Sequence, residues 1–324
     1  MTTVLTAREP RDLLAAVPVV LGFRPSESVV MLTFGGRHCF GARVDLPDLG
    51  PAADEPDDRW DTVDELAEVL LAPVLEHGAD RVAFVLYTGD AMLAGRVGRS
   101  LVDTFSRAGV GVVDVLRADR GRWTCVPCRA PGVEEPMRPY DDRTHPFAAQ
   151  AVFDGRVTRS TRDALRSGLA TDDGLRRLTE EAAHGLSPPA DDEPDRVLEV
   201  LARCVGAGRL PDDEESARVL RVVTRVEVRD AALFAVRSPS AVAHLEVWSS
   251  LLRRAADAQV PDAAAVTAFC AWQSGNGALA WCALDRCFEV DPRHPLGLAL
   301  AECLVRAVPP TSWDDRPDDG LDPA

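Results

Sequence analysis

The stretch SVVMLTFGG, residues 28–36, decides the fold of the first half of this chain. Its first seven residues are nearly all apolar and include β-branched types, which predicts an interior strand that is buried on both faces. Gly35-Gly36 predicts a tight turn, because glycine adopts positive φ without steric cost. Residues 38–44 are then expected to return as the antiparallel partner strand.

Working outward from this hairpin, the pattern alternates between helices and strands. Residues 11–21 predict a short amphipathic helix that ends at Gly22. A second near-continuous apolar run, residues 81–88, predicts another interior strand, and Asp119-Arg120-Gly121 predicts a hairpin turn. The remaining segments are helices at 61–76 and 92–108 and strands at 110–116 and 122–126. This order predicts an α/β N-terminal half, a mixed sheet covered by helices, over residues 1–154, with the strand order left open.

After about residue 155 the strand signals cease and helical periodicity takes over. The predicted helices span 161–169, 173–184, 194–204, 213–236, 241–255, 262–272, 278–290 and 295–307. They predict an all-helical C-terminal half over residues 155–308, followed by a disordered acidic tail at 309–324 from which Trp313 is able to dock back. Ala280, Leu284, Cys287 and Pro292 have the spacing of the second helix of a tetratricopeptide repeat, but an array needs several repeats. We therefore expect a single tetratricopeptide-like helical hairpin.

Composition restricts the classes of function. The 324 residues carry a net charge of −16, which gives no basic surface for nucleic acid. The absence of lysine excludes Schiff-base chemistry and a P-loop. The sequence has no run of 18 apolar residues and no secretory signal at its start, so we expect a cytoplasmic protein that does not bind membranes.

Cys125-Val-Pro-Cys128 is the motif most suggestive of chemistry. Structural zinc needs four ligands, and the sequence fixes only this pair. A thioredoxin-like site would place the first cysteine at a helix N-terminus, whereas the residues that follow do not favour a helix. Zinc, redox chemistry and ordinary turn cysteines all remain open. We favour turn cysteines, and expect no metal and no cofactor.

Three polar pairs are further candidates for a ligand or partner site. Arg43 and Asp45 flank one residue of a predicted strand and so point to one face, either as a binding pair or as an edge-strand salt bridge.

Arg229 and Asp230 lie among apolar residues of a predicted helix, which favours a buried structural pair. Gln273 and Asn276 lie in a polar turn between two apolar helices. They serve either the geometry of that turn, which we favour, or contacts with a ligand or partner.

The motifs also resemble one known family. The combination resembles an actinobacterial family catalogued only as domain of unknown function 4192, and the resemblance runs from about residue 8 to Trp313. It rests on Gly22-Phe23-x-Pro25-x-x-Ser28-Val29-Val30, Arg43-x-Asp45-Leu46-Pro47, Arg229-Asp230-Ala231, Ala271-Trp272-Gln273-x-Gly275-x-Gly277, and Asp291-Pro292. Members typically carry a cysteine cluster near Cys125 and Cys128, which is reduced here to one Cys-x-x-Cys. The family is uncharacterised, so the resemblance implies no activity.

Two functions from different classes fit the sequence. The first is a non-enzymatic protein-binding or regulatory module that holds a protein partner on its helical surfaces. The alternative is an enzyme or small-ligand sensor with a site between the two halves, near Arg43, Asp45, Gln273 and Asn276. The sequence contains no recognisable catalytic constellation, which favours the first.

Overall fold

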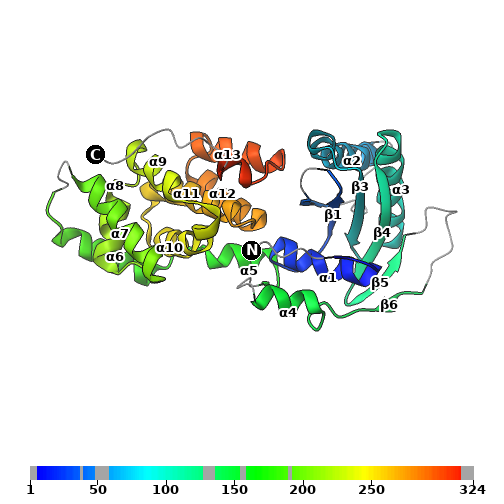
Figure 1. Ribbon diagram of the computed structural model, residues 1–324, viewed down its shortest axis with the longest axis horizontal. Coiled ribbons are helices and arrows are strands. Elements are labelled where there is room, and N and C mark those ends of the chain that lie inside the picture. The colour runs from blue at the N-terminus through cyan, green and yellow to red at the C-terminus, as the bar shows by residue number, and fades with distance from the viewer. Residues whose placement is uncertain are drawn as a thin grey trace. The chain divides into compact units, whose positions relative to one another are not determined.

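The computed structural model describes residues 6–36, 39–47, 58–126, 136–153, 158–188 and 192–314. The chain divides into two compact units, Met1–Arg162 and Asp163–Ala324, and each is described by itself below (Figure 1). The boundary predicted from the sequence lies between residues 154 and 155.

The first unit is built on one six-stranded mixed sheet with the order β2-β1-β3-β4-β5-β6. Only β3 and β4 pair in parallel, with helix α3 between them in sequence, and the other neighbours are antiparallel. The strands are β1 (Ser28–Phe34), β2 (Gly41–Asp45), β3 (Arg81–Tyr87), β4 (Gly111–Asp119), β5 (Arg122–Cys125) and β6 (Arg138–Pro139). The mixed α/β fold predicted for this half is therefore confirmed.

The two apolar segments that predicted interior strands are β1 and β3. Each lies between two other strands, and all but one residue of each is buried. The structure thus confirms the two-sided burial that their near-continuous apolar sequences predict. The predicted hairpin at residues 119–121 joins β4 to β5.

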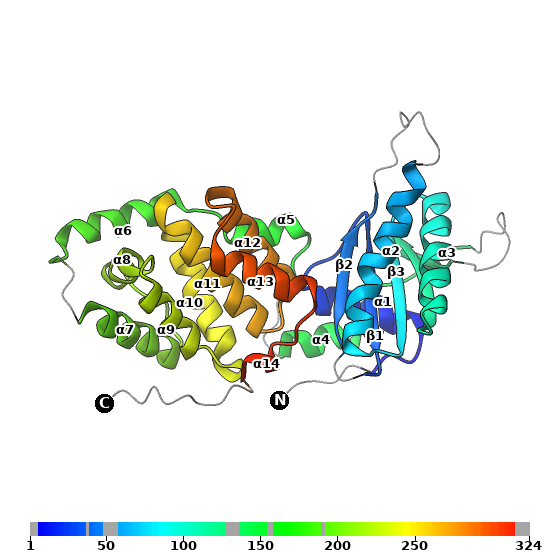
Figure 2. The same ribbon diagram turned by 90° about the horizontal axis from the view of Figure 1, so that it is seen from above.

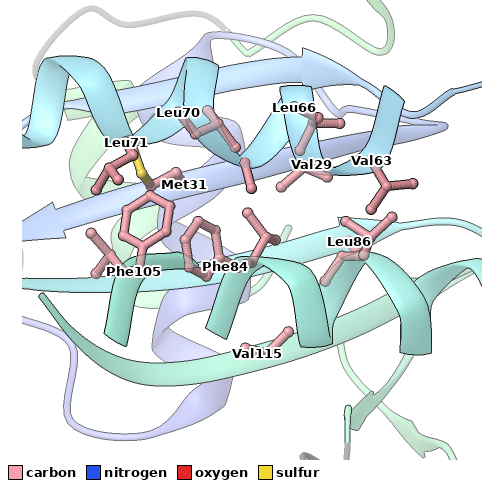
Figure 3. Close-up of a cluster of buried hydrophobic side chains, with 14 of the residues drawn as sticks. Val29, Met31, Val63, Leu66, Leu70, Leu71, Phe84, Leu86, Phe105 and Val115 are labelled. Carbon is pink, nitrogen blue, oxygen red and sulfur yellow. The ribbon is translucent and has the colours of Figure 1, made fainter. Parts of the chain in front are cut away.

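Helices cover both faces of the sheet (Figures 1 and 2). Helices α2 (Asp58–His77) and α3 (Ala91–Arg107) cover one face, and the hydrophobic cluster beneath them holds alternate residues of β1 and β3. At its centre the rings of Phe84 and Phe105 meet edge to face, with centroids 5.0 Å apart (Figure 3). Helices α1 (Pro10–Leu21) and α4 (Pro146–Phe153) pack together, and α1 also contacts β2 and β3.

The second unit is helical, as predicted. Its centre is α11 (Val260–Gln273), in which every residue is buried. It packs against the neighbouring helices, and its closest partner is α12 (Gly277–Val290), with which it forms the predicted hairpin (Figure 2). The other helices are α5 (Arg162–Gly168), α6 (Asp173–Gly185), α7 (Glu193–Ala207), α8 (Asp213–Val222), α9 (Val226–Ala235), α10 (Ala241–Arg254), α13 (Pro295–Val305) and α14 (Thr311–Asp314), with single 3₁₀ turns at Ser238–Ser240 and Asp257–Gln259.

Two details differ from the sequence prediction. The helix predicted over residues 213–236 is two helices, α8 and α9, with a turn at residues 223–225. The β-branched run Val222-Val223-Thr224 weakens the helix there, and the turn lets Val222 and Val223 both be fully buried.

The second difference concerns the tail, whose residues 309–314 were predicted to be disordered. These residues are ordered and include α14. The ring of Trp313 meets the ring of Phe269 at 4.7 Å, and the backbone oxygen of Pro310 accepts a hydrogen bond from Gln273. The aromatic contact provides the apolar burial that the acidic composition did not indicate. Residues 315–324 lie outside the described ranges.

Replacing Phe84 by alanine should lower the free energy of unfolding of the first unit by about 3–5 kcal/mol, because it leaves a cavity in a fully buried cluster. The matched control is Met92→Ala at the start of α3, where the side chain is 81% exposed and the change should stay within about 0.5 kcal/mol. Chemical unfolding followed by circular dichroism measures both. Equal losses in the two variants would contradict this assignment of the core.

Candidate ligand-binding site

A polar pocket lies where the two parallel strands end. Its volume is about 460 Å³, within the range typical of small-molecule sites. The last residues of β3 and β4, Tyr87 and Asp119, both line it. In α/β sheets the carboxyl ends of parallel strands are the usual place for a ligand. The full lining is Pro18, Arg24, Pro25, Tyr87, Asp119, Arg120, Gly121, Tyr140, Asp141, Asp142 and Arg143.

Tyr87 is the most unusual group in this pocket. Its side chain is buried, with the residue only 8% exposed, and its hydroxyl oxygen has no hydrogen-bond partner within the described part of the chain. Ser28 lies directly opposite in the antiparallel β1–β3 ladder, and its buried hydroxyl also has no partner there. A buried hydroxyl without a partner costs roughly 1–3 kcal/mol. These two residues, paired across the ladder, therefore mark a place where hydrogen bonding is incomplete within the described part of the chain.

The loop after α1 places Arg24 at the pocket. Helix α1 ends at Gly22, whose φ of 77° is in the left-handed region, and whose N–H donates to the oxygen of Pro18. Arg159 then pairs with this loop, because its N–H donates to Gly22 and its oxygen accepts from Arg24. The guanidinium Nε of Arg24 donates to Asp142 at 2.8 Å. Contacts between residues more than a hundred positions apart therefore form this side of the pocket.

The β4–β5 hairpin forms the opposite side. Its two turn residues, Arg120 and Gly121, have φ of 43° and 73°, and two positive φ values are typical of a tight two-residue hairpin. The oxygen of Gly121 accepts from the N–H of Tyr140, which ties the next wall residue to the turn. Asp141 then accepts from the N–H of Arg143 and from the hydroxyl of Thr144. This turn leads the chain towards α4.

The pocket holds both tyrosines of the chain. Burial, and then the nearby Tyr140 and Asp142, raise the pKa of Tyr87 well above its usual value. Burial, with Asp142 and Asp119 adding and Arg24 opposing, raises the pKa of Tyr140 to about 12. Both side chains therefore stay as neutral phenols at physiological pH, and each hydroxyl is available both to donate and to accept.

Arg43 and Asp45, the first candidate pair from the sequence, form a salt bridge on the edge strand β2. The Arg43 side chain is largely buried, and its guanidinium lies over the ring of Phe23, 5.8 Å from the centroid. Asp45 is exposed. The geometry is that of the edge-strand salt bridge, the simpler of the two alternatives.

Arg229 belongs to a buried ionic group, but its buried partner is not its neighbour in sequence. Its Nη1 lies 2.8 Å from Asp262 of α11, whereas Asp230 is about half exposed and 3.5 Å away. The ring of His294 also lies 3.2 Å from Asp262. Burial raises the pKa of Asp262, but hydrogen bonds from His294 and Arg229 outweigh it and lower the pKa below its usual value. Asp262 and His294 were missed by the sequence analysis, because only the packing of α9, α11 and α13 brings them together.

Gln273 and Asn276 both make contacts within the second unit. Gln273 is buried, accepts from the hydroxyl of Ser238 and donates to the oxygen of Pro310. Asn276 caps α12, since its side-chain oxygen accepts from the N–H of Leu279 at 3.1 Å. Gly275, with φ of 76°, supplies the positive φ of the turn. Both polar side chains thus stabilise the turn where α11 ends and α12 begins.

The last candidates from the sequence are the two cysteines of the Cys-x-x-Cys motif, Cys125 and Cys128, as metal ligands. Cys125 is half-buried at the end of β5, and Cys128 lies outside the described residues. Within the described ranges, no three His, Cys, Asp or Glu side chains group as a metal site. Likewise, no described helix combines the length and hydropathy needed to cross a membrane.

Tyr87, Tyr140, Arg24 and Asp142 were not among the candidates from the sequence. One signal pointed to the tyrosines, because the 324 residues contain only two of them and one lies next to the end of a predicted interior strand. The strand order was needed to use that signal. Parallel pairing of β3 with β4 brings their carboxyl ends to one edge, where α/β sheets usually bind ligands.

The fold is that of a two-unit protein with a mixed α/β first unit and a helical second unit. The family with the description "Domain of unknown function (DUF4192)" matches residues 10–311. This chain belongs to the DUF4192 family, as its motifs indicated. No curated protein and no solved structure matches it.

The cap at Asn276 leads to a graded prediction. Asn276→Ala should lower the free energy of unfolding of the second unit by about 1 kcal/mol, because the N–H of Leu279 loses its acceptor. Asn276→Gly should cost only about 0.3 kcal/mol, since glycine tolerates the N-cap position. Urea unfolding of both variants measures the difference. Equal losses would show that the amide does not act as a cap.

The raised pKa values of the two tyrosines predict an alkaline signature. Above pH 10 the unfolded chain loses its tyrosine protons while the folded chain keeps them. The free energy of unfolding therefore falls as the pH rises from 10 towards 12. Tyrosinate absorbance should stay low through pH 10 in the native protein and rise near pH 10 in denaturant. The Tyr140→Phe variant, which leaves only Tyr87, should resist ionisation at least as strongly. A native tyrosine that ionises near pH 10 would contradict the buried geometry.

Proposed function

We propose that this protein is a non-enzymatic, ligand-binding regulatory module whose first unit binds a small polar molecule in the pocket beside Tyr87. The observation that carries the proposal is the pocket at the ends of β3 and β4, which is lined by Tyr87, a buried residue whose hydroxyl has no partner within the described ranges. A ligand that hydrogen-bonds to it gains the interaction and removes the cost of the unmade bond. The surrounding arginine and aspartate side chains supply further donors and acceptors.

We further propose that the protein resides in the cytoplasm of an actinobacterium and has no nucleic-acid or membrane partner. The combination of family motifs in the sequence supports the actinobacterial origin. Buried cysteines such as Cys204, Cys270 and Cys287 support a reducing compartment, because they pack as small apolar side chains. The net charge of −16 opposes binding to a polyanion.

Binding is tested by ligand-observed NMR with a mixture of small polar metabolites. The wild-type chain and the control Ser312→Ala, which removes an exposed hydroxyl in the second unit, should transfer saturation to the same compounds. Tyr87→Phe keeps the ring and removes one oxygen, so it should weaken binding roughly three- to tenfold, the value of about one hydrogen bond. Binding that survives Tyr87→Phe unchanged, or no binding by the wild type, would overturn the proposal.

A second candidate function is protein binding by the helical second unit. The α11–α12 hairpin favours it, because Ala264, Ala268 and Ala280 allow the close helix packing of a tetratricopeptide-like unit. Helix α13 packs beside the hairpin and exposes Leu298 and Val305. A protein that the wild-type chain retains and a Leu298→Glu, Val305→Glu variant releases would support this function. Equal retention by both would count against it.

A further inference from the structure

The charged residues that line the Tyr87 pocket form pairs among themselves. Asp142 is held by Arg24 at 2.8 Å, and Asp119 lies 3.9 Å from Arg120. These two pairs come from separate walls of the pocket, the loop after α1 and the β4–β5 hairpin. Each carboxylate on these walls therefore has its own guanidinium.

The third carboxylate, Asp141, is held by hydrogen-bond donors of Arg143 and Thr144 rather than by a salt bridge. The N–H of Arg143 lowers the pKa of Asp141 most, the hydroxyl of Thr144 contributes, and the Arg143 guanidinium adds to the effect. The lining thus contains three aspartates, each with an arginine beside it, and its remaining polar side chains, Tyr87 and Tyr140, are neutral phenols. The pocket is rich in hydrogen-bonding groups but has no net charge.

This balance selects against ions. An ion bound beside Arg24 and Asp142 would lose its hydration and meet two charges that are already paired, so it would have to break that pair or remain uncompensated. A neutral hydroxyl group meets no such cost. It donates to a carboxylate, accepts from a guanidinium and exchanges either kind of bond with a phenol.

The apolar and aromatic part of the lining suits the carbon–hydrogen surface of a ligand that carries hydroxyl groups. Pro18 and Pro25 are apolar, and the two tyrosines bring aromatic rings. The carbon–hydrogen faces of such a ligand pack against these residues, while the hydroxyls at its edge bond to the charged pairs of the pocket. Alternating carbon–hydrogen and hydroxyl surface is the chemistry of saccharides and polyols.

We infer that the ligand of the Tyr87 pocket is an uncharged, polyhydroxylated small molecule of the saccharide or polyol class. The inference rests on the proposed function and deepens it. The Tyr87 hydroxyl forms a direct bond with one ligand hydroxyl, and the Arg24–Asp142 pair bonds to the hydroxyls of the same molecule from the opposite wall.

The test uses probes that share a scaffold and differ in charge. The full-length chain is titrated with the neutral probes glucose, trehalose and myo-inositol, and with glucosamine and gluconate as the cationic and anionic counterparts of glucose. Ligand-observed NMR detects binding, and calorimetry gives Kd at about 0.1 M and about 1 M salt, where the Debye length falls from about 10 Å to about 3 Å. At least one neutral probe should bind with a Kd that salt leaves within about twofold. Tyr87→Phe should raise that Kd roughly three- to tenfold.

A second variant tests the charge balance directly. Arg24→Gln leaves Asp142 without its guanidinium, so the pocket becomes acidic and should bind glucosamine better than glucose. The control Ser312→Ala should retain the wild-type order of affinities. Melting temperatures of all variants check that each one folds.

The outcomes distinguish a failure of the ligand class from a failure of the proposed binding function. Tyr87-dependent binding of a charged probe in preference to every neutral one, or a Kd that rises steeply with salt, overturns the ligand class and leaves the proposed binding function standing. Failure of every probe in this panel and of the metabolite mixture overturns both. Salt-insensitive, Tyr87-dependent binding of a neutral probe supports both.

Discussion

The parallel pairing of β3 with β4 is the constraint on which the first unit depends. The two strands run in the same direction and α3 connects them, so their carboxyl ends lie at the same edge of the sheet. The register shifts once, where Val113 of β4 is passed over between Val112 and Asp114. Beyond this irregularity Tyr87 pairs with Ala118, which places Asp119 and the hairpin beside the end of β3. A slip of one residue would turn Tyr87 towards the opposite face.

Long-range contacts complete the pocket around that edge. The loop after α1, the β4–β5 turn and residues 140–143 come from three parts of the chain. They are held by hydrogen bonds that Arg159 donates to Gly22, Arg24 donates to Asp142 and Tyr140 donates to Gly121. Each bond joins a loop to a distant segment, so the loops owe their geometry to tertiary structure. One of these bonds, from Arg24 to Asp142, also pairs two charges of the pocket.

The second unit uses its polar residues differently. In the buried helix α11, Asp262 meets Arg229 and His294, Thr267 donates to backbone oxygens, and Gln273 joins two loops. These side chains satisfy one another, as buried polar groups must in a stable core. The polar motifs that drew attention in the sequence therefore have structural roles here. The pocket of the first unit is instead lined by residues that form no continuous motif.

The sequence by itself determined the classes of the two halves, the interior strands, the hairpin turns and the helical hairpin. These follow from local periodicity, because the apolar pattern of a segment and its turn residues act over a few positions. Some residues within that reach were also placed correctly. Arg43 and Asp45 point to one face of a strand, and Asn276 serves its turn.

Only the tertiary structure decided which strands are neighbours, where the helix predicted over 213–236 breaks, how Trp313 orders residues 309–314, and that Tyr87, Tyr140, Arg24 and Asp142 share one pocket. The physical reason is the separation along the sequence of the groups that interact. A pocket, a buried ion pair and a strand order depend on groups that chain folding brings together over tens to hundreds of positions, and no local pattern encodes those distances.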